Sequence, residues 1–289
     1  MTILDERIPL VGPSSAGSVT PFGAQVMAWS PDGETPVLWL SERAVLDGSE
    51  PVRGGIPVCL PWFGAGPDGT RAPSHGFARI SRWRALDADE APEGPGLASC
   101  CLRLDHDPGA ATGRAGGDPF PHRFHAILRV SVTDDLVISL TVANDDDHPI
   151  RIEEALHTYF AVGDVKDVTI TGLEGADYQD LVRGDSRWRT QIGELALVGP
   201  TDRIYRSEAG LVLADPRRRR AITVDKDGSA DTIVWNPWAE GAAALADLGD
   251  QDWQHFVCVE AGNVGDDAVD LAPGEDHTMV LVLHVDPMA

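Results

Sequence analysis

The feature that most restricts the fold is an alternation of apolar and polar residues along Phe124–Val132. Every second residue is apolar, whereas the intervening positions include His125 and Arg129. A period of two residues is that of a β-strand with one buried face. Two aspartates follow, and a second apolar run then covers residues 136–142. The pattern therefore predicts an antiparallel hairpin.

Short apolar segments of this kind recur along the chain, and Gly, Pro and Asp turns separate them. Helical periodicity is confined to one short segment, residues 239–248. Many short strands joined by turn residues predict an all-β fold, a large antiparallel β-sandwich with few short helices. Their spread over the whole length favours a single domain, residues 1–289. The other expected strands are residues 37–40, 97–102, 210–214, 221–224 and 278–285.

The composition is strongly acidic, because 46 Asp and Glu residues against 23 Lys and Arg residues give a formal net charge of -23. This charge argues against nucleic acid and against an anionic membrane as partners. No apolar run approaches the roughly 18 residues of a membrane-spanning helix, and the first residues lack the basic and apolar parts of a signal peptide. We therefore expect a cytoplasmic protein, a monomer, with no membrane partner.

Patterns for metals and cofactors are weak. The histidines of H-R-F-H, His122 and His125, lie where a strand begins, and they would need helical spacing to share a metal. Residues 144–148 lack the glycine and the final glutamate of a calcium loop, so we interpret them, like the arginines 217–220, as a solvated turn. Since no dinucleotide fingerprint or phosphate-binding glycine loop occurs, we expect no metal and no cofactor. The cysteines form no C-x-x-C pair and are expected to be free thiols: Cys59, Cys100, Cys101 and Cys258.

The least regular segment is R-G-G-I-P-V-C-L-P-W-F-G, residues 53–64, which H-G-F-A-R, residues 75–79, follows closely. Adjacent glycines permit backbone angles closed to other residues, and two prolines fix φ. Arg53, His75 and Arg79, together with two aromatic residues, could bind a polar and anionic small molecule. The alternative is a connecting loop whose aromatic residues plug the end of a sheet.

Three more polar residues stand in apolar surroundings. His157 lies in E-A-L-H-T-Y-F, where a histidine serves as a hydrogen-bonded core residue, a metal ligand or a general acid/base. Glu260 ends the apolar run F-V-C-V-E, where an ionised carboxylate is costly unless it is paired. Its alternative role is a salt bridge to a buried arginine. Asp202, in T-D-R-I-Y, is a further candidate or else a turn residue.

In this order, RGGIPVCLPWFG, HGFAR, EALHTYFAVGDV, TDRIY, VWNPW and FVCVEAGNV closely resemble the hexose-6-phosphate mutarotases, or glucose-6-phosphate 1-epimerases. These belong to the galactose mutarotase-like, or aldose 1-epimerase, superfamily. The resemblance runs from about residue 53 to the C-terminal strand. It implies a galactose mutarotase-like supersandwich and an isomerase that interconverts the α and β anomers of sugars such as glucose 6-phosphate.

The resemblance also implies roles for individual residues. The histidine of the L-H-[ST]-Y-F element, which is the general acid in that family, falls on His157. The glutamate of the C-V-E strand, which is the general base, falls on Glu260. The residues that hold the substrate fall on Arg53, His75, Arg79 and Asp202.

The chemistry of anomer exchange agrees with these roles. A base must take the proton of the C1 hydroxyl while an acid protonates the ring oxygen, so that the ring opens, rotates about C1–C2 and recloses. Glu260 as carboxylate and His157 as imidazolium could fill these places without a metal or a redox cofactor. Arg53 and Arg79 could each make charge-assisted contacts to a phosphate.

Other functions stay open. A free-aldose 1-epimerase would use the same acid and base on an uncharged sugar. A carbohydrate-binding β-sandwich without catalysis would need neither group. A glycosidase would ordinarily use two carboxylates, and no second carboxylate is as prominent in the sequence as Glu260.

Overall fold

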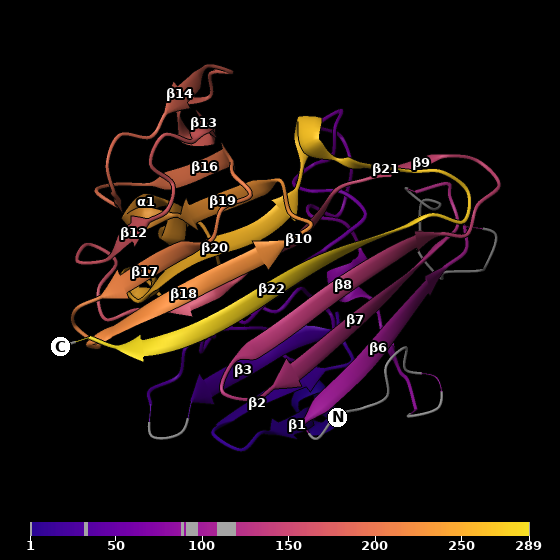
Figure 1. The fold of residues 1–289 in the computed structure, drawn as a ribbon, viewed down its shortest axis with the longest axis horizontal. Coiled ribbons are helices and arrows are strands. Elements are labelled where there is room, and N and C mark those ends of the chain that lie inside the picture. Colours follow the sequence, from indigo (N-terminus) through magenta and orange to yellow (C-terminus); the bar gives the residue numbers. More distant parts are fainter. Residues whose placement is uncertain (1, 32–33, 88–89, 91–97, 109–119, 289) are drawn as a thin grey trace.

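The computed structural model describes residues 2–31, 34–87, 90, 98–108 and 120–288. Its long strands lie side by side in twisted antiparallel sheets (Figure 1). The largest sheet has nine strands. In sheet order they are β15 (Leu195–Ala196), β12 (Thr169–Thr171), β17 (Leu211–Asp215), β18 (Arg220–Asp227), β22 (Asp276–Pro287), β8 (Leu136–Asn144), β7 (Phe124–Val132), β6 (Ser99–His106) and β5 (Arg84–Ala85).

A second sheet has eight strands, two of which contain the candidate site residues Asp202 and Glu260. Its strand β20 is buried along its whole length and pairs with three neighbours. In order the sheet contains β14 (Trp188–Thr190), β13 (Asp177–Asp180), β16 (Thr201–Arg206), β19 (Asp231–Asn236), β20 (Phe256–Asn263), β10 (Glu154–Leu156) and β4 (Val58–Cys59), while β11 (Tyr159–Ala161) also pairs with β20.

Smaller elements complete the described fold. A three-stranded sheet contains β1 (Ile8–Val11), β2 (Ser15–Thr20) and β3 (Gln25–Pro31), and β21 (Val269–Leu271) pairs with β9 (Ile150–Ile152). Helices are short, as the sequence predicted. They are α1 (Trp238–Ala243) and the 3₁₀ turns η1 (Ile3–Glu6), η2 (Ala78–Ile80), η3 (Leu181–Arg183), η4 (Asp252–Gln254) and η5 (Gly265–Asp267).

The hairpin predicted from the alternating pattern is confirmed as β7 and β8. Buried and half-buried residues alternate along both strands. Leu128 lies opposite Leu140, and β22 places Met279 on the other side of Leu140. All three side chains are buried, so the apolar face of this sheet forms part of one continuous core. Burying a side chain of this size contributes about 1.5–3 kcal/mol before the entropy cost of ordering it.

Three expectations need correction. Residues 37–40 form no regular strand, because this segment crosses between two others and makes only single bridges, from Leu38 to Phe160 and from Leu40 to Gly54. The helix expected over residues 239–248 ends at Ala243 as α1. Its only buried residue is Ala242, and its interior contains Gly241, which costs about 1 kcal/mol relative to alanine.

The third correction concerns the arginines at the tip of the β17–β18 hairpin. Arg220 is not solvated but buried, and its Nη2 donates a 2.6 Å hydrogen bond to the carbonyl of Ala161. Its Nη1 donates to the carbonyl of Thr35. The expected strand at residues 97–102 is β6 from Ser99 onward, while residue 97 lies outside the described residues.

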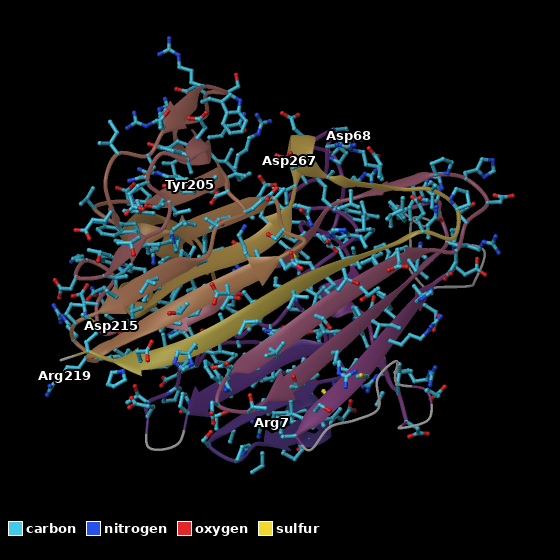
Figure 2. All side chains as sticks on the ribbon, in the orientation of Figure 1. Arg7, Asp68, Tyr205, Asp215, Arg219 and Asp267 are labelled. Carbon is cyan, nitrogen blue, oxygen red and sulfur yellow. The ribbon has the colours of Figure 1, made fainter. Side chains whose placement is uncertain are left out.

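Side chains with oxygen and nitrogen tips project all around the outline of the molecule, among them Asp68 and Asp267 near the top of the view (Figure 2). None of the helices in the described part of the chain is long and apolar enough to span a membrane.

Candidate active site

The glycine pair after Arg53 fixes the local path of the chain. Gly54 and Gly55 have φ of 115° and 64°, in the region that favours glycine. A Cβ atom on Gly55 would lie 2.2 Å from the carbonyl oxygen of Val26, so no larger residue fits. The Gly55 N–H donates to the carbonyl of Trp39. This close packing holds the preceding arginine against a cavity.

His157 lies where the chain passes from β10 to β11, and both of these strands pair with β20. Its backbone N–H donates to the carbonyl of Pro57 at 3.0 Å. Glu260 lies within β20, opposite Ile233 of the neighbouring β19. The eight-stranded sheet therefore brings the two residues together although about 100 positions separate them in sequence.

A cavity of about 460 Å³ opens over this part of the sheet, and we call it the inner cavity. All the site residues expected from the sequence line it: Arg53, His75, Arg79, His157, Asp202 and Glu260. This volume is ample for a monosaccharide. The alternative role of Asp202 as a turn residue is excluded, because it lies within β16 opposite Trp235.

His157 and Glu260 contact each other directly. The His157 Nε2 atom lies 3.3 Å from the Glu260 Oε1 atom, and both side chains are buried. The other polar atoms of the pair, His157 Nδ1 and Glu260 Oε2, have no hydrogen-bond partner among the described residues. Because unpaired buried polar atoms are costly, their presence in a cavity wall indicates a place where a ligand binds.

The surroundings favour the uncharged form of each group. Burial lowers the pKa of His157 well below its usual range, and the positive charges of Arg79 and Arg53 lower it further. Burial likewise raises the pKa of Glu260 well above its usual range, and the charge of Asp202 adds to this effect. In the protein alone the two shifts therefore favour a neutral imidazole beside a protonated carboxyl, and groups in such close contact titrate together.

The pKa values of His75 and Asp202 are also shifted by burial and by neighbouring charges. Burial and the nearby charge of Arg79 lower the pKa of His75 to about 3, so its imidazole is neutral. The Gly64 N–H donates to His75 Nδ1 at 3.3 Å, which leaves the proton on Nε2. Burial and the charge of Asp180 raise the pKa of Asp202 to about 6.

Several lining residues were not identified from the sequence. Trp235 and Ile233 alternate on β19, and they face the cavity from the register positions opposite Asp202 and Glu260. The period of two in I-V-W, residues 233–235, could have indicated a shared face, but not what that face contacts. Of the two aromatic residues in the glycine-rich segment, Phe63 lines the cavity, whereas Trp62 is fully buried as a plug.

Arg53 is held by two partners that the sequence did not reveal. Its Nε donates to the Asp247 carboxylate at 3.0 Å, and its Nη1 donates to the Tyr159 hydroxyl at 3.0 Å. The Tyr159 ring stacks on the His157 ring with centroids 4.8 Å apart and an angle of 10°. Tyr159 thus contacts both the arginine and the histidine of the cavity.

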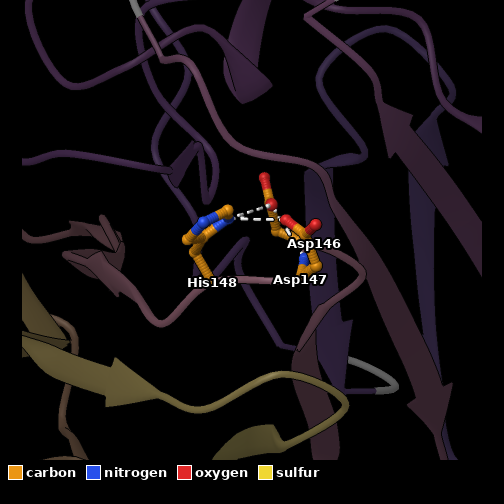
Figure 3. A group of neighbouring side chains, drawn as sticks. All are labelled: Asp146, Asp147 and His148. Atoms are coloured by element: carbon orange, nitrogen blue, oxygen red, sulfur yellow. Dashed lines mark hydrogen bonds and ion pairs between the residues drawn. The ribbon is translucent and has the colours of Figure 1, made fainter.

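A separate polar group lies on the turn after β8, outside the inner cavity (Figure 3). It consists of Asp146, Asp147 and His148. The side chains of Asp147 and His148 are 78% and 74% exposed. Asp146 already accepts the backbone N–H groups of Arg123 and Asp147. These features fit the solvated turn expected here. The four cysteines are free, as expected.

The sequence matches the family described as aldose 1-epimerase over residues 13–284. A protein from Cenchrus ciliaris, provisionally named a glucose-6-phosphate 1-epimerase, is 32% identical over 260 residues, 88% of this chain and 77% of its own length. A protein of the same provisional name from Escherichia coli is 31% identical over 240 residues, 82% of this chain and 76% of its own length.

Solved structures agree with these matches. The crystal structure of a provisionally assigned mutarotase from Salmonella typhimurium superimposes with a TM-score of 0.81 and 28% identity, covering 98% of this chain and 92% of that one. The fold is therefore the mutarotase-type β-sandwich that the sequence predicted. The chain belongs to the aldose 1-epimerase family. It is an isomerase that acts on a sugar.

Proposed function

We propose that the protein is a hexose-6-phosphate mutarotase, which interconverts the α and β anomers of sugars such as glucose 6-phosphate. The main observation is the buried contact of 3.3 Å between His157 Nε2 and Glu260 Oε1 in a cavity of sugar size. The provisional names of the relatives from Cenchrus ciliaris and Escherichia coli support the choice of a 6-phosphate substrate.

In the proposed reaction Glu260 accepts the proton of the C1 hydroxyl and His157 protonates the ring oxygen. The C1–O5 bond breaks, and the open chain carries an aldehyde at C1 and a hydroxyl at C5. Rotation about C1–C2 presents the other face of the aldehyde. The two residues then exchange roles as the C5 hydroxyl attacks C1. No net proton is gained or lost, so the pair needs only one proton throughout.

Substrate binding would help to place this proton. In the protein alone, burial favours a neutral imidazole and a protonated carboxyl. The positive charges of Arg79 and Arg53 also lower the pKa of His157. A phosphate dianion bound to these arginines would offset their field at His157. The pKa of the imidazole would then rise, which favours the imidazolium form that begins the reaction.

Arg53 and Arg79 are the proposed phosphate contacts. Arg79 donates through Nη2 to the carbonyl of Ser74, while its buried Nε has no partner in the described part of the chain. Arg53 donates through Nε to Asp247 and through Nη1 to Tyr159, and no hydrogen bond of its Nη2 is seen among the described residues. His75 and Asp202 are proposed to hold hydroxyl groups of the sugar. The reaction needs no metal or cofactor, and we propose a cytoplasmic monomer consisting of one domain.

The test is anomer exchange of glucose 6-phosphate and of glucose, measured side by side by saturation-transfer NMR. The proposal expects kcat/KM to be higher for the phosphate by about 10²-fold or more, since two charge-assisted contacts contribute about 1.5–3 kcal/mol each. Equal values for the two sugars would contradict the 6-phosphate part of the proposal.

A free-aldose 1-epimerase is the second candidate, and one observation favours it. Arg53 is already paired with the Asp247 carboxylate, which neutralises part of its charge. In that case glucose would exchange at least as fast as its 6-phosphate in the same experiment.

A further inference from the structure

A second cavity of about 440 Å³ adjoins the inner cavity, and we call it the outer cavity. The two cavities share two lining residues, Arg53 and Arg79. His157 and Glu260 line the inner cavity only. The two arginines therefore stand between the acid/base pair and a separate compartment.

The lining of the outer cavity has three arginines against two carboxylates, and the Asp250 carboxylate outside this lining lies 3.8 Å from Arg43 Nη1. The lining contains Arg43 in addition to the two shared arginines, against the carboxylates of Glu50 and Asp247. Asp247 is already bound to Arg53 Nε at 3.0 Å. In a chain with a net charge of -23, three guanidinium groups around one compartment form a local site that can offset the repulsion of an anion.

Arg43 is fixed at this wall by its backbone and side chain. The Arg43 N–H donates to Ser41 Oγ, which itself donates to the carbonyl of Asp247 at 2.6 Å. Arg43 Nη1 donates to the carbonyl of Leu248 at 3.0 Å. These contacts connect residues 41–43 to residues 247–248, so both segments form one wall of the outer cavity.

Donors remain available around the compartment. Arg43 uses Nη1 for Leu248, and no hydrogen bond of its Nε or Nη2 is seen within the described ranges. Tyr159 accepts a hydrogen bond from Arg53, so its own hydroxyl proton is free to be donated. The Tyr159 hydroxyl thus adds a neutral donor beside the guanidinium groups.

We propose that the outer cavity receives the phosphate of the substrate, and that Arg43 and the Tyr159 hydroxyl complete its binding site. The inference rests on the proposed function. The C6 branch leaves the ring at C5, next to the ring oxygen that His157 protonates. In the binding mode that we propose, a phosphate on that branch extends past Arg53 and Arg79, which line both cavities. Arg43 contacts it on the far side and distinguishes a phosphorylated sugar from a free one.

The first test replaces the charge of Arg43. Arg43→Gln should raise KM for glucose 6-phosphate about five- to tenfold with kcat within about twofold, and it should change glucose exchange far less. Arg43→Lys, which keeps the charge, should recover part of the loss. The matched control is Arg84→Gln, because Arg84 is 55% exposed against 56% for Arg43, pairs with Glu90 and lines neither cavity.

A second variant tests the same compartment without removing a charge. Tyr159→Phe keeps the ring that stacks on His157 and loses only the hydroxyl. KM for glucose 6-phosphate should rise about threefold or more, while kcat stays within about twofold.

Inorganic phosphate provides a third test, since it should occupy the outer cavity and inhibit the wild type competitively. Arg43→Gln should raise the inhibition constant of inorganic phosphate about five- to tenfold.

The outcomes separate this inference from the proposed function. If Arg43→Gln and Tyr159→Phe leave KM for glucose 6-phosphate unchanged while Arg79→Ala raises it, the phosphate lies outside the outer cavity and the inference is wrong. If none of the three variants distinguishes the phosphate from glucose, the 6-phosphate function itself is wrong. A loss that Arg84→Gln reproduces would show a general effect of surface charge and would also contradict the inference.

Discussion

At the scale of single residues, the proposed chemistry depends on two groups that exchange protons with the sugar. His157 and Glu260 each lie where burial opposes their charge, and only their mutual contact and a bound sugar offset that cost. Arg53 and Arg79 contribute in a different way, since their positive charges act on both the histidine and an anionic substrate. Because the arginines have this separate role, their removal should affect glucose 6-phosphate more than glucose.

Arg79→Ala and Arg53→Ala are expected to weaken transition-state binding of glucose 6-phosphate by about 1.5–3 kcal/mol each, with much smaller effects on glucose. The reason is that each arginine provides a charge-assisted contact that only the phosphate can use. Measurement of kcat/KM for both sugars by saturation-transfer NMR checks this expectation. An equal loss for both would make the arginines structural residues or contacts near C1.

The residues of the inner cavity were largely predictable, because a histidine and a glutamate in apolar strands are costly unless they have a role. Asp247 was not predictable. It lies 194 positions from Arg53 in a loop of ordinary composition, and only the folded chain brings its carboxylate within 3.0 Å of the guanidinium. Tyr159 could be placed on the same side as His157 by its spacing, but its contact with Arg53 could not.

At the scale of elements, strands in which apolar residues recur at every second position were predicted well, and segments without this alternation were not. The nine residues of Phe124–Val132 coincide with β7, because one face of that strand is buried throughout. Residues 37–40 have an equally apolar composition but only single bridges to their neighbours. Composition indicates burial, whereas a ladder of backbone hydrogen bonds depends on which segments lie alongside.

Asp231, the first residue of β19, makes the stability of the folded protein depend on pH. Its carboxylate accepts the Val264 N–H at 2.9 Å, and burial raises its pKa to about 7. Between about pH 4 and 7 the unfolded chain has released this proton while the native protein retains it. The free energy of unfolding therefore falls as pH rises through this range.

Asp231→Asn should remove this fall in the free energy of unfolding, which is about 1–3 kcal/mol. The reason is that the amide cannot ionise but can still accept the Val264 N–H. Urea unfolding of wild type and variant at pH 5 and at pH 8 measures the effect. The variant should gain stability relative to wild type at the higher pH. If the free energy of unfolding changes by the same amount between pH 5 and pH 8 in wild type and variant, Asp231 does not titrate in this range.

At the scale of the whole molecule, the eight-stranded sheet and the loops at residues 53–64 and 75–79 line the inner cavity, where the proposed reaction opens and closes the sugar ring with proton transfer and no change of oxidation state. The function therefore should not depend on a metal. We expect anomer exchange to persist within about twofold after prolonged treatment with EDTA, since proton transfer between fixed groups needs no Lewis acid. Loss of activity that a single metal ion restores would contradict this expectation.

The most direct measurement of the central claim is the rate of exchange between the α and β anomers of glucose 6-phosphate, by saturation-transfer NMR, for wild type, His157→Asn and Glu260→Gln. Circular dichroism would establish that each variant is folded, with Arg84→Gln as a surface control. Each catalytic substitution is expected to lower the enzymatic rate about 10²–10⁴-fold, because it removes a positioned acid or base. A folded variant that keeps nearly the wild-type rate would contradict the role assigned to that residue.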